Sequence, residues 1–460
     1  MQVEKELTYN DLTEGQKMAF DTVMAAVKQT STISQERYHV TINGQAGTGK
    51  TTLTKFIVRE IIAQGINGVI LAAPTHAAKK TLMKLSGMEA ATIHSVLGIS
   101  PNNYEDQMLF EQNDVPDLAN CRVLICDEGS MYDDKLVNLV MSSIPPWCVV
   151  IVLGDKEQIR PVAPGESIPR KSPFFSHAKF KQITLTEVKR SDGPILEVAR
   201  NILNNGWLYE NIKTDEEGNQ HGVFTFNPEK DSSSVQWFFK EYFKRVKTPE
   251  DFKKVRCFAF TNKMVDSLNK IIRKTIYKTE EPFIVGEELV MQGPVQEETI
   301  APNGQRLKKI VFSNGQYVKV LSVRSTVDSL TAPYVDSQVD INVWVLEIES
   351  ADPEDPYENR VIRVIDIDSI PLYNEFLSLV AYTYKNWNRI GKAPWKAFWS
   401  TKTKYSSVKP EAVCTIHKSQ GLTCDTAFLC TSGMSNLDSD IIKELVYVGS
   451  TRPKHNLYWI

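Results

Sequence analysis

The sequence lacks any apolar run close to the roughly 20 residues that a membrane-spanning helix requires. Its first residues, Met1 to Glu6, are too polar for a secretory signal peptide. Its 7 cysteines form no C-x-x-C pair and lie in or beside apolar, strand-like runs. These absences argue against a membrane protein, a disulfide framework and a zinc site, and they predict a cytoplasmic protein with reduced thiols.

A strong charge of either sign is also missing, since 53 Lys and Arg face 56 Asp and Glu, for a formal net charge of −3. The composition therefore does not indicate a nucleic-acid-binding protein. Any nucleic-acid site would be a local groove on a nearly neutral surface. The 460 residues, 42% hydrophobic and 24% charged, are typical of a globular protein with about two to four domains.

The stretch GQAGTGKT at residues 44–51 matches the phosphate-binding loop G-x-x-x-x-G-K-[ST]. Its glycines let backbone N–H groups turn toward a triphosphate, Lys50 would reach the β- and γ-phosphates, and Thr51 would offer a hydroxyl to Mg²⁺. A strand-like run before the loop and a helical apolar stripe after it argue against a chance glycine-rich turn. The residues predicted to bind ATP here are Gly44, Gly47, Thr48, Gly49, Lys50 and Thr51.

Strand-like runs alternate with helical patterns through the first part of the chain, which predicts a parallel sheet covered on both faces. These runs lie at residues 39–43, 68–73, 121–126 and 148–153. A second α/β region begins near residue 190. From about residue 281 the sequence changes to the alternating pattern that is typical of β-strands. There, residues 309–312 and 317–320 flank Asn314-Gly315, which predicts a hairpin.

A weak internal repeat supports two equivalent lobes. THAAKKTLMKL (75–85) can be laid on TNKMVDSLNKI (261–271), and Thr92-Ile93-His94 recurs as Thr415-Ile416-His417. The second copy would carry a long insertion of about the length of the β-rich region. Matches this short also arise by chance, so the repeat is a hypothesis.

An acidic pair, Asp127-Glu128, follows the run 121–126 at the edge where a parallel sheet binds ligands. Asp127 is predicted to hold Mg²⁺ and Glu128 to polarise the attacking water, with a solvated acidic pair as the alternative. Gln158 follows the next strand-like run, where its amide would contact the γ-phosphate or the water.

The ordered set of motifs resembles the superfamily-one helicases of the B type, related to RecD. The matching segments are Gln16, GQAGTGKT (44–51), APTHAAKK (73–80), TIHS (92–95), CDEGS (126–130), GDKEQIRPV (154–162), LTEVKR (185–190), TIHKSQG (415–421) and VYVGSTR (446–452). The resemblance implies an α/β protein with two RecA-like lobes and ATP in the cleft between them. Gly129 after the acidic pair and Pro453 after the last motif depart from the family pattern, and we expect Gly129 to add flexibility beside Glu128.

Domain boundaries follow from the resemblance and the changes in texture. Lobe 1A is expected at 1–95 and 121–187, with a pin insertion (1B) at 96–120. Lobe 2A is expected at 188–280 and 411–460. It would carry an SH3-like β-barrel (2B) at 281–375 and its aromatic, lysine-rich extension at 376–410.

The family motifs assign further roles around the nucleotide. Gln16 would recognise adenine, although Thr13 and Gln16 also fit a helix capping box. Arg190 and Arg452 would reach across the cleft as arginine fingers, with a surface ion pair as the alternative for each. Gln16 and Gly421 thereby join the nucleotide-binding residues, and the predicted catalytic residues are Lys50, Asp127, Glu128, Gln158, Arg190 and Arg452.

The resemblance also implies that single-stranded DNA crosses both lobes. The matching residues are Thr75, His76, Thr92, His94, Thr415, His417 and Lys418. Hydroxyl and imidazole contacts to phosphate need no large positive charge, whereas an isolated histidine more commonly has a structural role. Phe110 resembles the aromatic tip of a strand-separating pin, or else it packs inside the insertion. The alternatives for Trp387, Trp395 and Trp399 are docking against the pin, core packing and base stacking.

The predicted function is an ATP- and Mg²⁺-dependent DNA helicase that moves 5′ to 3′ on single-stranded DNA and opens duplex junctions. Its polarity rests on the resemblance alone. The resemblance implies a protein that works as a monomer in a cytoplasm, a host's if the gene is carried by a phage. It leaves replication or recombination proteins open as partners. A small-molecule kinase, a nucleotide switch, an RNA helicase and a pure translocase are the alternatives.

Overall fold

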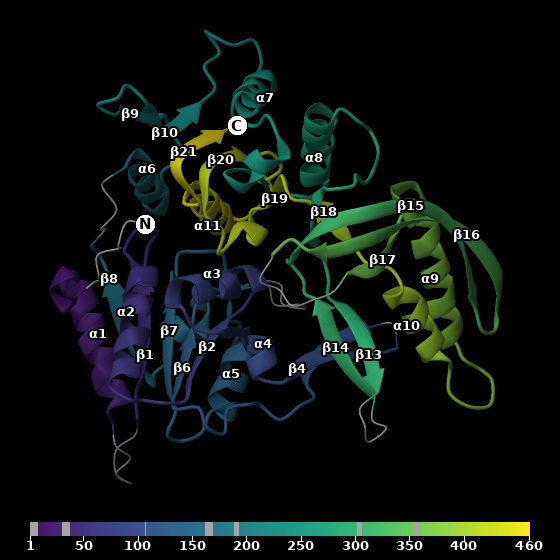
Figure 1. The fold of residues 1–460 in the computed structure, drawn as a ribbon, viewed down its shortest axis with the longest axis horizontal. Coiled ribbons are helices and arrows are strands. Elements are labelled where there is room, and N and C mark those ends of the chain that lie inside the picture. Colours follow the sequence, from purple (N-terminus) through teal and green to yellow (C-terminus); the bar gives the residue numbers. More distant parts are fainter. Residues whose placement is uncertain are drawn as a thin grey trace. The chain divides into compact units, whose positions relative to one another are not determined.

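The computed structural model describes residues 8–29, 37–105, 107–161, 169–187, 193–300, 306–352 and 359–460 (Figure 1). The chain divides into two compact units. The first comprises Met1–Gly98, Asp114–Ile276 and Ala412–Ile460, and the second comprises Ile99–Asn113 and Tyr277–Glu411.

The first sheet of the first unit is a six-stranded parallel sheet with the strand order β3-β2-β6-β7-β1-β8. Its strands are β1 (His39–Gly44), β2 (Val69–Ala73), β3 (Ala90–Thr92), β6 (Val123–Cys126), β7 (Val149–Gly154) and β8 (Phe180–Leu185). Its helices are α1 (Glu14–Val27), α2 (Lys50–Ala63), α3 (His76–Ser86), α4 (Ile93–Val96) and α5 (Asp134–Ser143). Every residue of β1 and β7 is buried, as expected for strands covered on both faces.

The second sheet of this unit has the order β19-β11-β20-β21-β10-β9, and only β9 is antiparallel to its neighbour. Its strands are β9 (Asn211–Thr214), β10 (Gln220–Thr225), β11 (Val255–Ala259), β19 (Val413–Thr415), β20 (Cys424–Cys430) and β21 (Pro453–Trp459). Its helices are α6 (Pro194–Leu203), α7 (Ser234–Arg245), α8 (Asn262–Tyr277) and α11 (Ser439–Ser450). The predicted α/β fold with two lobes is therefore confirmed.

The two copies of the internal repeat form the same arrangement of paired strands and a following helix, one in each sheet. In the first, Ala73 of β2 pairs with Thr92 of β3, and Thr75 caps the helix that follows β2. In the second, Ala259 of β11 pairs with Thr415 of β19, and the Thr261 hydroxyl accepts from Met264 N at the start of α8.

The second unit combines a five-stranded antiparallel sheet, two hairpins and two helices. The sheet order is β17-β16-β15-β12-β18. Its strands are β12 (Glu288–Met291), β15 (Tyr317–Ala332), β16 (Val335–Ser350), β17 (Arg360–Ile365) and β18 (Val408–Pro410). The hairpins pair β4 (Ile99–Tyr104) with β5 (Gln107–Gln112), and β13 (Val295–Ile300) with β14 (Arg306–Phe312). Helices α9 (Ile370–Lys385) and α10 (Trp395–Thr403) pack on each other and on the distal ends of β15 and β16.

The predicted hairpin around Asn314-Gly315 is wrong. The turn exists, with Gly315 at φ 81° and Gln316 N bonded to Ser313 O at 3.1 Å. However, β14 pairs with β13 while β15 pairs with β12 and β16, so the turn joins two sheets. The reason is that Met291, at the end of β12, exchanges backbone hydrogen bonds with Gly315 and Gln316 and takes the place of β14 beside β15.

Short 3₁₀ helices complete the described chain: η1 (Tyr9–Asp11), η2 (Gly129–Met131), η3 (Pro173–Phe175), η4 (Pro249–Lys253), η5 (Ile367–Ser369) and η6 (His417–Ser419). Among the residues described, none of the helices has both the length and the apolar character needed to span a bilayer.

Candidate active site

The phosphate-binding loop joins β1 to the N-terminus of α2, as its sequence predicts. Gly47 and Gly49 have left-handed backbone conformations, with φ of 84° and 75°, which residues with a side chain rarely adopt. Lys50 is the first residue of α2, and its ammonium group donates to the carbonyl oxygens of Gly44 and Gln45. The loop and the positive end of α2 thus form an anion-binding concavity.

Gln16 forms the predicted capping box and also contacts the phosphate-binding loop. Its backbone N–H donates to the Thr13 hydroxyl at 3.3 Å, and its side-chain oxygen accepts from Thr13 N at 3.1 Å. Its amide Nε2 donates to the carbonyl of Thr48 at 3.0 Å, and the residue is only 1% exposed. Both polar ends of the side chain are therefore occupied, and adenine contact would require the amide to leave these partners.

The acidic pair lies at the carboxyl end of β6, beside the loop. Burial, with the neighbouring charge of Glu128, raises the pKa of Asp127 to about 7, while the charge of Lys50 opposes the shift. Glu128 has a left-handed backbone at φ 50°, a conformation that costs about 1–3 kcal/mol for a non-glycine residue and is concentrated at functional sites. The pair is thus a half-buried cluster of acidic oxygens facing the loop's lysine.

The expectation that Gly129 adds flexibility beside Glu128 does not fit its surroundings. Gly129 is buried, and a Cβ built on it would lie 2.5 Å from Cγ1 of Val152. Its missing side chain lets η2 pack directly against β7, so the glycine fixes the backbone after the acidic pair by close approach.

The segment after β7 supplies Gln158 and a second carboxylate that sequence reasoning missed. Gln158 is buried, and its side-chain oxygen has no hydrogen-bond partner among the described residues. Asp155 is fully buried, and burial raises its pKa against the charge of Lys50. Buried polar atoms are nearly always bonded, so the Gln158 oxygen is available to a partner outside the described residues.

Helix α11 of the second sheet brings three side chains to this segment. Asp440, Glu444 and Tyr447 are spaced to share one helical face. Glu444 accepts from Arg160 Nε at 2.8 Å, and Asp440 lies 3.4 Å from the same guanidinium. The Tyr447 hydroxyl donates to Asp155 at 2.6 Å and accepts from Ala46 N at 3.2 Å. The motifs GDKEQIRPV and VYVGSTR contain several of these residues, but nothing in the sequence pairs them.

The two predicted arginine fingers are Arg190 and Arg452. Arg190 lies outside the described residues. Arg452 is buried, and its Nε donates to Val448 O at 3.0 Å within the second lobe. Its guanidinium also lies near the carbonyl of Leu422 and the hydroxyl of Thr451. The structure does not bring Arg452 to the phosphate-binding loop, although its charge acts on Tyr447, which does contact the loop.

Gly421 lies at the contact between the lobes, with a left-handed φ of 75°. A Cβ built on it would meet Ala78 of α3 at 3.4 Å. The residue therefore lies against the helix that carries Thr75 and His76 in the first lobe, and no described contact joins it to the phosphate-binding loop.

The threonines predicted to contact DNA share one local geometry. Each hydroxyl accepts from a backbone N–H at the start of a helix: Thr75 from Ala78, Thr92 from Ser95, and Thr415 from Lys418. A hydroxyl that accepts in this way still has its own proton to donate. Helix N-termini and hydroxyl donors suit phosphate without requiring net positive charge. Thr261 has the same geometry and was not predicted, although the internal repeat pointed to it.

The histidines lie beside these threonines. Burial lowers the pKa of His94 and of His417 from their ordinary value of 6.5, so both favour the neutral form. His76 is the first residue of α3, and Lys418 is exposed on η6. Any contact of His94 or His417 with phosphate at neutral pH would thus be a hydrogen bond from a neutral ring.

The β4–β5 hairpin belongs to the second unit. Phe110 is 61% exposed but lies within β5, opposite Pro101, whereas the turn lies between Tyr104 and Gln107. Phe110 is therefore not the tip of the hairpin. The turn is held instead by Trp399, whose indole N–H donates to the carbonyl of Glu105 at 2.5 Å.

The other two tryptophans differ from Trp399. Trp395 packs edge-on against Tyr384 and Phe398, and Trp387 donates to the carbonyl of Gly391 at 2.9 Å. Both pack against the cluster of buried residues between α9, α10 and the strand ends. Of the predicted alternatives, docking against the hairpin thus applies to Trp399, and core packing applies to Trp395 and Trp387.

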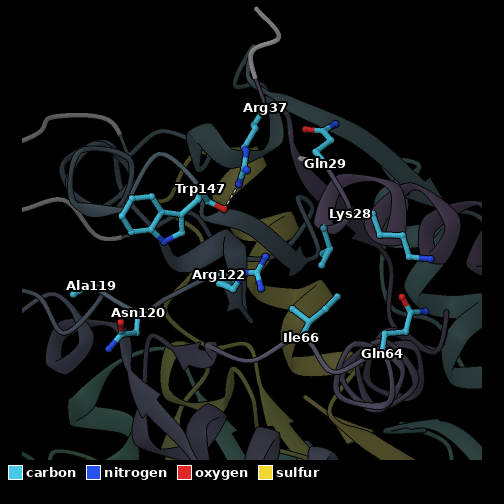
Figure 2. A pocket seen from close by; sticks show the side chains of 10 residues that line it. Lys28, Gln29, Arg37, Gln64, Ile66, Ala119, Asn120, Arg122 and Trp147 are labelled. Carbon is cyan, nitrogen blue, oxygen red and sulfur yellow. Dashed lines mark hydrogen bonds between the residues drawn. The ribbon is translucent and has the colours of Figure 1, made fainter. Parts of the chain in front are cut away.

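A cavity of about 740 Å³ lies at the N-terminal ends of the strands of the first sheet, at the end away from the phosphate-binding loop (Figure 2). Its lining includes Lys28, Arg37 and Arg122, and Arg37 donates to the carbonyl of Trp147. Lys28 and Gln64 cap the C-termini of α1 and α2, whose N-termini face the phosphate-binding loop. A cation at a helix C-terminus offsets the macrodipole, which gives Lys28 a structural explanation, and the lining of the cavity contains no residue of the phosphate-binding loop.

Comparison with known families finds two matches. Residues 12–222 match a family described as an AAA domain, and residues 280–410 match one described as the Dda helicase SH3 domain.

Among characterised proteins, the ATP-dependent DNA helicase dda of Enterobacteria phage T4 is 46% identical over 99% of this chain and 100% of its own length. The ATP-dependent RecD2 DNA helicase of Deinococcus radiodurans is 32% identical over 38% of this chain and 23% of its own length.

Among solved structures, Pif1 helicase from Bacteroides in complex with ADP-AlF3 and single-stranded DNA aligns over 98% of this chain and 92% of that chain. Its sequence identity is 16% and its TM-score is 0.49.

Proposed function

The chain belongs to the family of ATP-dependent DNA helicases that contains the phage T4 protein, and we propose that it couples ATP hydrolysis to movement along single-stranded DNA and to duplex unwinding. The movement is proposed to run 5′ to 3′. The expected cytoplasmic location, action as a monomer, and work beside replication or recombination proteins belong to the same proposal.

One observation carries the proposal: the same threonine hydroxyl geometry, which suits a phosphate, occurs in both lobes, and the lobes meet at the phosphate-binding loop. Thr92 and Thr415 occupy equivalent registers in the two sheets. Tyr447 of the second lobe bonds directly to Ala46 in the loop. A change in nucleotide can therefore alter the separation of two equivalent grips on one strand, which is what translocation requires.

The residues of the loop and of β6 suit a magnesium nucleotide. Thr51 and Asp127 offer the hydroxyl and carboxylate oxygens that Mg²⁺ prefers. The raised pKa of Asp127 reflects the burial of two neighbouring acidic groups, whose repulsion a bound cation would offset. When bound, Mg²⁺ would neutralise charge on the phosphates. Lys50 binds the β- and γ-phosphates, while Glu128 orients the attacking water and accepts its proton.

Gln158 and the arginines act around the γ-phosphate in this scheme. The unpaired side-chain oxygen of Gln158 would accept from the attacking water, and its amide N–H would bond the γ-phosphate. Arg452 would leave Val448 when the lobes close and would stabilise transition-state charge, together with Arg190. The adenine contact of Gln16 and the link from Gly421 to nucleotide remain part of the proposal.

The test measures ATPase rate with and without single-stranded DNA or RNA, alongside unwinding of duplexes with a 5′ or a 3′ tail. We expect DNA to stimulate hydrolysis and only the 5′-tailed duplex to open. Lys50→Ala should abolish hydrolysis while leaving DNA binding intact. A DNA-independent ATPase would indicate a kinase-like protein, RNA preference an RNA helicase, and stimulation without unwinding a pure translocase; each would overturn the proposal.

A further inference from the structure

The hydroxyl of Tyr447 bridges two different parts of the first lobe from a helix of the second. It donates to the carboxylate of Asp155 at 2.6 Å and accepts from the backbone N–H of Ala46 at 3.2 Å. Tyr447 is 1% exposed, and Asp155 is fully buried. Because burial raises the pKa of Tyr447, the phenol keeps the proton that it donates.

Ala46 is the third residue of the phosphate-binding loop, whose backbone N–H groups serve to hold phosphate oxygens. One N–H directs its proton along one line, so a good hydrogen bond to the tyrosine oxygen excludes an equally good bond to a phosphate oxygen. The hydroxyl thus occupies a backbone donor of the phosphate-binding loop.

The neighbouring contacts of α11 do not share this property. Glu444 and Asp440 lie on the same helical face, but they contact Arg160 and no atom of the loop. The face therefore contains one contact with the phosphate-binding loop and another that joins the lobes away from it.

We propose that Tyr447 is a positioning residue whose hydroxyl competes with nucleotide phosphate for the N–H of Ala46. The inference rests on the proposed function of this site. Phosphate that takes the Ala46 N–H leaves Tyr447 bonded to Asp155 alone. The number of hydrogen bonds that hold α11 to the first lobe then depends on whether the loop holds phosphate. This dependence passes nucleotide occupancy to the second lobe.

Tyr447→Phe, which removes only the hydroxyl, is the direct test. Binding of a fluorescent ADP and of a non-hydrolysable ATP analogue would be titrated without DNA. We expect affinity to rise roughly 2- to 10-fold for at least one of the two nucleotides, because one competing hydrogen bond is removed. ADP-dependent changes in DNA affinity should shrink at the same time, since the lobes lose the link that reports the nucleotide.

Two matched variants separate competition from general loosening. Glu444→Gln weakens the contact of α11 with Arg160 without touching Ala46, so nucleotide affinity should not rise. Tyr242→Phe removes a buried hydroxyl of α7 in the same lobe and should leave affinity unchanged. Thermal unfolding of all variants would show that each is folded.

Unchanged or weaker nucleotide binding by Tyr447→Phe would overturn the inference, as would an equal gain in Glu444→Gln. If the buried carboxylate destabilises Tyr447→Phe, the double variant with Asp155→Asn is compared with Asp155→Asn alone, and the same tightening is expected. Nucleotide titration requires no unwinding, so a failure of the helicase proposal would appear separately in the DNA assays.

Discussion

Thr92 and Thr415 hold the same position in two different sheets. Each ends an edge strand, pairs with an alanine of the neighbouring parallel strand, and has a hydroxyl that accepts a backbone N–H of the helical turn that follows. The two residues are separated by most of the chain, including the entire β-rich unit. Their equivalence supports the proposal that both lobes contact the nucleic-acid backbone through the same threonine geometry.

Replacing both threonines should therefore weaken DNA binding more than either change alone. Thr92→Val and Thr415→Val keep the shape but lose the hydroxyl, and each should cost roughly 5- to 10-fold in affinity for a single-stranded oligonucleotide. Serine at either position should restore binding. Thr22→Val removes a half-buried hydroxyl that bonds only to Met18 O within α1; it is the control, and an equal loss there would contradict the assignment.

Arg452→Ala should leave nucleotide binding largely intact while slowing turnover by about 10³-fold or more, as for other arginine fingers. Arg452→Lys keeps the charge but not the planar fork and should recover only part of the rate. Steady-state ATPase assays with saturating DNA measure both. A kcat equal to that of the parent protein would show that Arg452 serves only the carbonyl contacts of its own lobe.

Trp399→Phe should uncouple unwinding from hydrolysis. The change keeps an aromatic ring on α10 but removes the N–H that holds the hairpin turn at Glu105, a bond worth about 1 kcal/mol. We expect slower strand separation with unchanged DNA-stimulated ATPase. Trp387→Phe removes an N–H that bonds to Gly391 and not to the hairpin, so it should have no such effect.

His39 should make the protein sensitive to acid. Burial lowers the pKa of His39 from 6.5 to about 4, and its Nδ1 accepts from Val150 N at 3.0 Å. The unfolded chain thus takes up a proton below pH 6.5 while the folded chain does not, so stability falls as pH falls toward 4. Between pH 7 and pH 5 this group should cost about 2 kcal/mol.

Urea unfolding at the two pH values measures this effect. His39→Gln can still accept the bond but does not titrate, so it should lose less stability on acidification than the parent protein. Equal losses in the two proteins would show that other groups cause the acid sensitivity.

Sequence reasoning predicted the local structure of the segments whose shape depends on neighbouring residues. The loop at 44–51, the acidic pair after β6 and the threonine-histidine repeats are short segments whose geometry follows from the strands and helices beside them. It failed where partners are distant in the chain. Nothing in the sequence pairs Tyr447 with Asp155 or Arg160 with Glu444, because those contacts depend on how two lobes meet.

The wrong hairpin has the same origin. Asn314-Gly315 does form a turn, but turn chemistry does not specify which strand lies beside β15, and β12 occupies that place. Phe110 was placed at a tip by resemblance, whereas the strand register puts it opposite Pro101. Register depends on the whole strand pair and not on one aromatic residue.

The second unit is built from two segments that leave different lobes. The β4–β5 hairpin departs from the first lobe at Gly98 and returns at Asp114, whose N–H bonds to Gly98 O at 3.2 Å. The β-rich segment departs after α8 and returns at β19 of the second lobe. Trp399 and Glu105 then join the two segments by a side-chain hydrogen bond. The lobes are therefore tethered to each other a second time, by the bond between tryptophan and turn, in addition to the direct contact of α11 with the phosphate-binding loop.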